Sequence, residues 1–312
     1  MKRKFLLTLG LFLGVFCVGF LLNTSVNADD KAEKPAVWLQ ISPVSKRLSL
    51  KPGTTHEEEV TVENIGSEDF TFKVYASPYS VTDEDYNLNF TNETKFTQMA
   101  RWIRFDQTEY SLAVGEKQTV KFYVEVPEKD KVPAGGQYAT VFAESSGDNT
   151  DTQSSGIRTI SRVGLVIYAN IPGETNESSE LVDYSVPTFY THGNISAVSK
   201  INNTGNTDFG ARYHMEIRPL IGDVVYEKDE IHPVLPETGR RVEMVWDTTP
   251  LLGIFKVNYS VFAPGINRNE THIVFVIPIF VIVITLLLLT FIIVWIIITV
   301  KRRKSLRSRI RI

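Results

Sequence analysis

Apolar and polar residues alternate one by one along much of the chain, and this pattern constrains the fold more than any other feature. Val120 and Phe122, for example, alternate with Lys121 and Tyr123. Side chains two positions apart share one face of a β-strand, so the alternation is typical of antiparallel strands with one face in a core and one in water. We therefore predict an all-β fold between the two ends of the chain.

Two phrases occur twice in the same order. Residues 62–70 read V-E-N-I-G-S-E-D-F and residues 201–209 read I-N-N-T-G-N-T-D-F. A proline, a glycine three positions on and an aromatic residue two further on occur at 133–138 and again at 250–255. In the first phrase Asn and Gly supply turn conformations, and Phe begins the next strand. The repetition indicates two copies of one module.

Each copy contains about seven short strands separated by turns, which is typical of an immunoglobulin-like β-sandwich. We predict two such domains in tandem, at residues 36–172 and 173–270, with a short acidic linker at 172–180. The polar segment 145–156 is predicted to be a long hairpin loop between the last two strands of the first domain.

The N-terminus has the order of features of a secretory signal peptide. Three basic residues precede an apolar run at 5–22, and small Ala28 follows. We predict a signal peptide at residues 1–28, with an uncleaved anchor as the alternative. Cys17, the single cysteine of the chain, follows bulky Phe16, whereas a lipid-attachment site needs a small residue there.

A second apolar run lies near the C-terminus. Residues 273–300 carry no charge, and the basic tail 301–312 follows them directly. The run exceeds the ~20 residues that cross a bilayer, so it is predicted to be a transmembrane helix. Pro278 falls in its first turns, where a missing backbone donor costs least. Positive charge on one side marks that side as cytoplasmic, which predicts a single-pass protein of the cell membrane with its N-terminus outside.

Charge and cysteine content exclude several functions. Residues 29–272 carry 23 basic and 36 acidic side chains, a net charge of −13, which argues against a nucleic-acid partner. The same residues include no cysteine, which excludes a cysteine protease, a thiolate zinc site and a thiol redox enzyme.

No catalytic motif is present. The five histidines have no metal-ligand spacing, and the chain lacks a nucleophile elbow, a metalloprotease helix and a phosphate-binding glycine loop. We predict that the protein is not an enzyme and has no cofactor.

One acidic loop carries Asp83, Asp85 and Asn87 at alternate positions, as a calcium loop does. However, Leu88 stands where that motif needs glycine and Thr94 where it needs a bidentate glutamate, so we predict a solvated turn without a metal.

Residues 29–272 include seven N-x-S/T sequons. In a eukaryote they would indicate a type I membrane glycoprotein, which is one alternative for the whole chain. Matches by chance are common in a sequence rich in Asn and Thr, so the sequons do not decide the source.

Several phrases of the first domain form a recognisable set: I-S-P-V at 41–44, L-S-L-K-P-G at 48–53, F-K-V-Y-A-S-P-Y at 72–79, A-R-W-I-R-F at 100–105 and P-A-G-G-Q-Y-A at 133–139. Over residues 38–172 this set resembles the WxL-interacting protein family of Gram-positive bacteria. The resemblance implies a cell-envelope protein whose first domain binds peptidoglycan and which partners a WxL-type surface protein. The second domain does not match the family's usual second domain, so no host-binding role is carried over.

The first domain is also similar in outline to periplasmic pilus-chaperone domains, through its L-x-P-G, V-x-N and P-x-G-x-Y turns. Those chaperones bind partners by pairing strands at an exposed sheet edge. This similarity makes an assembly chaperone that acts by strand addition the main alternative function.

Aromatic and cationic side chains are the candidates for ligand binding, because sugar rings stack on aromatic faces and Arg pairs with carboxylates. The candidates are Arg104, Tyr86, Tyr79, Trp102 and Tyr138. A structural role is the competing interpretation: Trp102 is expected in the core, and Tyr138 resembles a tyrosine that ties its hydroxyl back to a corner. Arg104 and Tyr86 lie outside the expected core parity and are the stronger candidates.

Taken with the resemblance, the sequence predicts a non-enzymatic, membrane-anchored surface protein that acts as a binding or scaffold module. Its predicted partners are peptidoglycan, a WxL-type surface protein and, through the C-terminal helix, the lipid bilayer.

Overall fold

The computed structural model describes residues 35–146, 160–191, 194–248 and 252–309. The predicted signal peptide and most of the predicted hairpin loop lie outside the described residues, as do residues 310–312 of the predicted tail.

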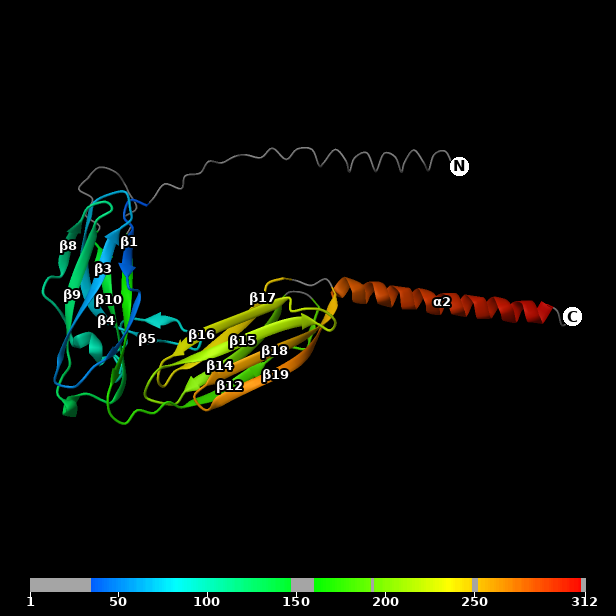
Figure 1. Ribbon diagram of the computed structural model, residues 1–312. Coiled ribbons are helices and arrows are strands. Elements are labelled where there is room, and N and C mark those ends of the chain that lie inside the picture. The colour runs from blue at the N-terminus through cyan, green and yellow to red at the C-terminus, as the bar shows by residue number, and fades with distance from the viewer. Residues whose placement is uncertain (1–34, 147–159, 192–193, 249–251, 310–312) are drawn as a thin grey trace. The chain divides into compact units, whose positions relative to one another are not determined.

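The first half of the chain forms a β-sandwich of two sheets (Figure 1). One sheet has the strand order β1-β3-β9-β7 and the other β2-β11-β10-β4-β8. A small hairpin, β5-β6, is separate from both. The strands are β1 (Leu39–Ser42), β2 (Ser45–Ser49), β3 (Thr55–Asn64), β4 (Phe70–Pro78), β5 (Ser80–Val81), β6 (Leu88–Asn89), β7 (Ile103–Phe105), β8 (Glu109–Leu112), β9 (Lys117–Glu125), β10 (Gly135–Ser145) and β11 (Arg162–Ile171), with 3₁₀ turns η1 (Gln98–Arg101) and η2 (Lys129–Lys131).

The second half forms another two-sheet sandwich, with orders β12-β14-β17 and β13-β19-β18-β15-β16. The strands are β12 (Ser179–Ser185), β13 (Phe189–Tyr190), β14 (Ile195–Asn203), β15 (Phe209–Pro219), β16 (Tyr226–Val234), β17 (Gly239–Trp246), β18 (Gly253–Ala263) and β19 (Ile266–Val276). The prediction of an all-β chain with two immunoglobulin-like sandwiches in tandem is confirmed.

The two sandwiches share most of their topology, although β7 of the first has no counterpart in the second. In each, the chain first adds a strand to the smaller sheet, then crosses to the larger sheet and pairs in parallel with the last strand of that sandwich. In the first sandwich β2 pairs with β11, and in the second β13 pairs with β19. The later strands also correspond, since β3, β4, β10 and β11 have the positions of β14, β15, β18 and β19.

The repeated phrase has the same structure in both copies. Asn64 is buried at the end of β3, and its Nδ2 donates to the carbonyls of Glu68 and Leu112, while its Oδ1 accepts the Gly66 N–H. Asn203, at the end of β14, makes the equivalent three bonds in the second sandwich. The turn therefore depends on an amide side chain that both donates and accepts.

Two separate cores fill the sandwiches, and most of their strands follow the predicted alternation, whereas β10 is buried on both faces. In β9 the residues Val120, Phe122 and Val124 are fully buried while Lys121 is exposed. The second core is built in the same way from the inward side chains of β14, β15, β17, β18 and β19.

The predicted start of the transmembrane segment, residue 273, is wrong. Residues 273–276 belong to β19, where Val274 and Val276 are buried in the second core. The second sandwich thus extends beyond residue 270. A continuous apolar run does not distinguish a strand with apolar residues on both faces from a membrane helix. The end of β19 and the start of α2 were therefore predicted as one helix.

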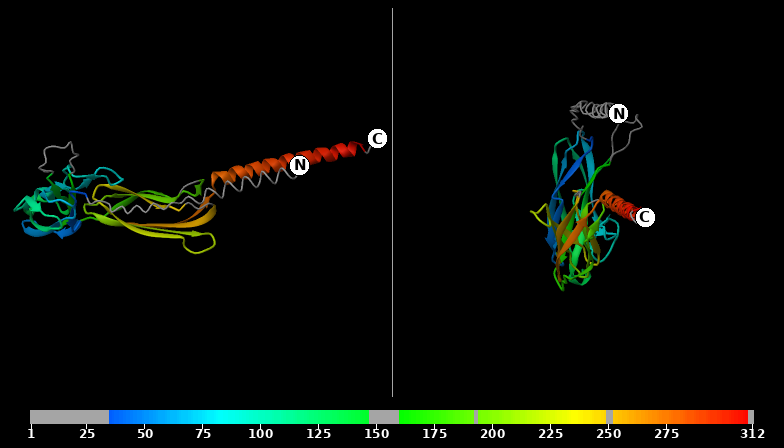
Figure 2. Two further views of the ribbon diagram at one scale, coloured as in Figure 1. Left: turned by 90° about the horizontal axis from the view of Figure 1, so that it is seen from above. Right: turned by 90° about the vertical axis from the view of Figure 1, so that its right-hand side faces the viewer.

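The helix α2 (Ile279–Arg309) begins after Pro278 and is continuous (Figure 2). Its apolar part, Ile279–Val300, has a mean hydropathy of 3.3 and is long and apolar enough to cross a membrane.

Candidate functional site

The edge of the second sandwich at β19 is open over most of its length. All eleven residues of β19 pair with β18 on one side. On the other side only Phe275 and Val276 pair, with the two-residue strand β13. Among the described residues no strand pairs with Ile266–Val274 on that side. An open edge of this kind is a template for pairing with another chain.

The register determines which backbone groups point outward. The Phe275 N–H donates to the Thr188 carbonyl, so residue 275 directs its backbone groups away from β18. In an antiparallel pair this direction alternates, so every second residue before it does the same. The outward set is Asn267, Asn269, Thr271 and Ile273.

The parallel strand covers less of the last strand in the second sandwich than in the first. In the first sandwich β2 pairs with five residues of β11, Val166 to Asn170. In the second, β13 pairs only with Phe275 and Val276, at the C-terminal end of β19. Residues Ile266–Val274 therefore have no strand partner on this side among the described residues.

The side chains of the open edge are arranged differently on its two faces. The four residues whose backbone groups point outward are uncharged, and their side chains share the exposed face of the sheet. The charged residues of β19, Arg268 and Glu270, lie on the opposite face and pair with each other at 2.5 Å. The other edge strand of the same sheet, β16, carries consecutive charges and Pro233, features that protect an edge from pairing. Hence β19, and not β16, has the character of a binding edge.

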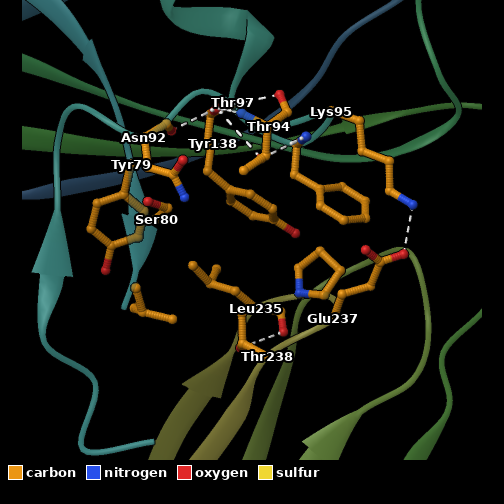
Figure 3. Close-up of a pocket in the computed structure, with 13 residues that line it drawn as sticks. Tyr79, Ser80, Asn92, Thr94, Lys95, Thr97, Tyr138, Leu235, Glu237 and Thr238 are labelled. Carbon is orange, nitrogen blue, oxygen red and sulfur yellow. Dashed lines mark hydrogen bonds and ion pairs between the residues drawn. The ribbon is translucent and has the colours of Figure 1, made fainter. Parts of the chain in front are cut away.

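Three of the five predicted ligand residues, Tyr79, Tyr86 and Tyr138, gather in a second location. They belong to a small apolar cluster that also includes Phe96 and Leu235. A partly open pocket of about 450 Å³ lies beside the cluster, with Tyr79, Tyr138 and Leu235 in its lining (Figure 3).

The hydroxyls of Tyr138 and Tyr79 and the ring of Tyr86 are already engaged by the chain itself. The Tyr138 hydroxyl donates to Asp208 Oδ1 at 3.1 Å and accepts the Asp208 N–H at 2.9 Å. The Tyr79 hydroxyl lies 3.3 Å from the hydroxyl of Tyr168. The guanidinium of Arg240 covers the ring of Tyr86 at 3.7 Å. Burial raises the pKa of Tyr79, Tyr86 and Tyr138 well above the ordinary range, so all three stay protonated at neutral pH.

The other two candidates lie elsewhere. Trp102 is packed in the first core, in agreement with the structural interpretation. Arg104 is exposed on β7, where it pairs with Glu125 at 2.7 Å and Asp106 at 2.5 Å and covers the ring of Tyr123. The five predicted residues therefore do not form one site.

The acidic loop is held by its own hydrogen bonds. Asp83 accepts both the backbone N–H and the side-chain N–H of Asn87, and these bonds lower the pKa of the Asp83 carboxyl. Glu84 pairs with Lys200 of the second sandwich. The Asp83 carboxylate is therefore already bound by two N–H groups of Asn87.

One group of possible metal ligands was not predicted. His214, Glu227 and Asp229 bring ligand atoms within 4.8 Å of one another. Neighbouring strands β15 and β16 place them together, with His214 directly opposite Asp229, so no spacing in the sequence marks them. His214 Nδ1 lies 3.2 Å from Asp229 Oδ1, an ordinary cross-strand pair on an open face.

Sequence reasoning also missed the β19 edge and the contacts of Arg240 and Asp208. No local pattern marks the edge, because Pro43 and Pro187 stand at corresponding positions before the two parallel strands and do not distinguish the sandwiches. The contacts of Arg240 and Asp208 join residues far apart in the chain, and no local pattern marks them.

No family model matches this chain, and no curated protein matches it. Among solved structures it is similar to the class 5 fimbriae chaperone CfaA, with a TM-score of 0.39 and 17% identity over 77% of this chain and 100% of that chain. It is also similar to a chain of the CsuC–CsuE chaperone–tip adhesion subunit complex of Acinetobacter baumannii, with a TM-score of 0.38 and 11% identity over 76% and 98% of the two chains. A chain of the Salmonella enterica SafA pilin–SafB chaperone complex gives a TM-score of 0.37 and 8% identity over 77% and 97%. At such low identity these similarities say nothing about what this chain binds.

Proposed function

We propose that this chain is a membrane-anchored, non-enzymatic binding protein that holds a partner protein by adding a strand of that partner to β19. The observation that carries the proposal is the run of unpaired backbone at Asn267, Asn269, Thr271 and Ile273. A strand laid along this edge can form several backbone hydrogen bonds, each of about 1 kcal/mol. The uncharged outward side chains do not oppose its approach.

The apolar helix determines where this edge would act. With α2 across the bilayer and the basic residues after Val300 in the cytoplasm, both sandwiches lie outside the cell. The binding edge would then face partners at the outer surface of the membrane. The two sandwiches serve as a rigid support in this proposal, and no residue has a catalytic role.

Binding of peptidoglycan and of a WxL-type partner stays a prediction from the sequence resemblance. The described aromatic residues give it no additional support, because the hydroxyls of Tyr79 and Tyr138 and the ring of Tyr86 make their contacts within the chain. Retention of the extracellular part on purified peptidoglycan, compared with an unrelated sandwich domain, would test the wall-binding prediction separately.

Site-specific photo-crosslinking tests strand addition. A photoreactive amino acid at Asn269 should capture a discrete partner in envelopes of the producing cell. Thr271→Pro removes one outward N–H and should abolish the crosslink, whereas Thr271→Val keeps the N–H and should preserve it. Both variants must retain the parent's thermal unfolding transition. A crosslink that persists in a folded Thr271→Pro protein would show that the partner does not pair with the backbone of β19.

A further inference from the structure

The end of the second sandwich that leads into α2 carries exposed apolar side chains in a row across its larger sheet. Phe189 lies opposite Phe275, and Phe275 lies opposite Ile254. The Leu220 N–H donates to the Ile254 carbonyl, which brings the turn after β15 into the same row. Ile221 in that turn is 91% exposed. We name six residues of this end the apolar collar: Phe189, Leu220, Ile221, Leu252, Ile254 and Phe275.

The collar is more apolar than an ordinary protein surface. Apart from Ile221, its members are between 38% and 60% exposed. Single exposed apolar residues are common on soluble proteins, but a contiguous group indicates an interaction surface. The apolar helix α2, which follows this end of the sandwich, indicates the surface that covers it.

The length of the helix determines how close the collar lies to a bilayer. The apolar part of α2 has 22 residues, which span about 33 Å, close to the ~30 Å of a hydrocarbon core. Because Lys301 follows directly, the helix has almost no excess length, and Ile279 must lie near the outer hydrocarbon boundary.

The connection from β19 to α2 is short. Only Ile277 and Pro278 separate the two elements, so Val276 and Ile279 lie at most about 11 Å apart. Their backbone is also tied to the sandwich, because the N–H groups of Ile277 and Ile279 donate to the carbonyls of Tyr190 and Thr191. The headgroup layer is about 5–8 Å thick on each side of the hydrocarbon, so this short, tied connection holds the end of the sandwich close to it.

We infer that the apolar collar docks on the outer leaflet, with Ile221 and its neighbours inserted at the level of the headgroups. This inference rests on the proposed membrane anchoring and goes beyond the proposed partner binding. One step further from the helix, exposed Lys256 lies opposite Ile273 and can direct its ammonium group to lipid phosphates. The collar thus fixes the second sandwich against the membrane surface.

Depth-sensitive fluorescence of the full chain in phosphatidylcholine vesicles tests the inference. With Cys17→Ser as background, an environment-sensitive label is attached at Ile221→Cys or, as the matched control, at Ile231→Cys. Ile231 is also an exposed isoleucine of the second sandwich, on β16, near the end away from α2. Lipids brominated in the upper acyl chain should quench the label at 221 at least about twice as strongly as the label at 231, and iodide in the water should do the reverse.

Equal quenching at the two positions would overturn the collar. Shielding of position 221 from iodide without lipid quenching would also overturn it, because a protein would then cover the surface. Flotation of the vesicles distinguishes both results from a failure of anchoring, since a chain that does not float with the lipid lacks the membrane span itself.

Discussion

The two copies of the repeated phrase have the same asparagine contacts but different aspartate contacts. Asn64 and Asn203 keep identical bonds, but the aspartates that follow them do not. Asp69 accepts the Val114 N–H within the first sandwich. Asp208 instead binds Arg47 at 2.7 Å and the hydroxyl of Tyr138. One copy therefore uses the aspartate to bind a backbone N–H of its own sandwich, and the other uses it to contact the neighbouring sandwich.

The buried amide leads to a prediction about stability. Asn203→Asp keeps the acceptor for Gly205 but replaces two donated bonds with a carboxylate facing the Thr207 and Val234 carbonyls. We expect the free energy of unfolding to fall by about 3–5 kcal/mol in urea denaturation at pH 7. Exposed Asn267→Asp is the control and should change it by less than about 0.5 kcal/mol. Equal effects would refute the role given to the amide.

At the residue scale, the sequence predicted contacts between residues that are close together in the chain. The Asn–Gly turn was predicted because two of the three bonds of each asparagine side chain close within four residues. The ring stacking of Arg240 on Tyr86 was not, because the two residues are far apart in the sequence and meet only after both sandwiches have folded. The positive φ of Tyr86, 65°, likewise has no signal in its residue type.

Among the elements, β19 is the one whose sequence is most ambiguous. Its final residues, Ile273 to Val276, are all apolar, so they lack the alternation that identified the other strands. Only burial separates them into two sets, with Val274 and Val276 inside and Ile273 and Phe275 outside. The fold class could be predicted from sequence, but the boundary between sandwich and helix could not.

Charge substitution at adjacent positions checks this boundary. Val274→Asp places a carboxylate in the second core and should lower the free energy of unfolding by about 4 kcal/mol. Ile273→Asp, on the exposed face, should change it by less than about 1 kcal/mol. Thermal unfolding of the full chain in detergent micelles measures both. If residues 273 and 274 were instead in a membrane helix, the two variants would unfold alike.

In the whole molecule, contacts between the two sandwiches combine charges with aromatic rings. Lys95 pairs with Glu237 at 2.6 Å, and Arg47 pairs with Asp208. Arg240 covers Tyr86 and also donates to the Pro233 carbonyl at 2.8 Å. Exposed ion pairs contribute little, so the buried tyrosines and Arg240 carry most of the coupling between the sandwiches.

Removing Arg240 should uncouple the sandwiches. Arg240→Ala loses the cation–π contact, and we expect about 1–2 kcal/mol of coupling to disappear, so that calorimetry resolves two unfolding transitions. Arg241→Ala is a matched control, because the Arg241 side chain lies by Glu243 and its link to Glu84 uses only the backbone. A single unchanged transition in Arg240→Ala would mean that the sandwiches are coupled by other contacts.

The short connection between β19 and α2 has a mechanical consequence. Any pull between the bilayer and a bound partner passes through Ile277 and Pro278 into the C-terminal end of β19. That strand is held by an antiparallel ladder of eleven residue pairs with β18. Because the proposed partner strand pairs with β19 itself, force directed along β19 loads the hydrogen bonds to the partner together in shear, while the ladder with β18 holds β19 in the sandwich. The proposed membrane anchor therefore joins the sandwich at a strand suited to bearing tension.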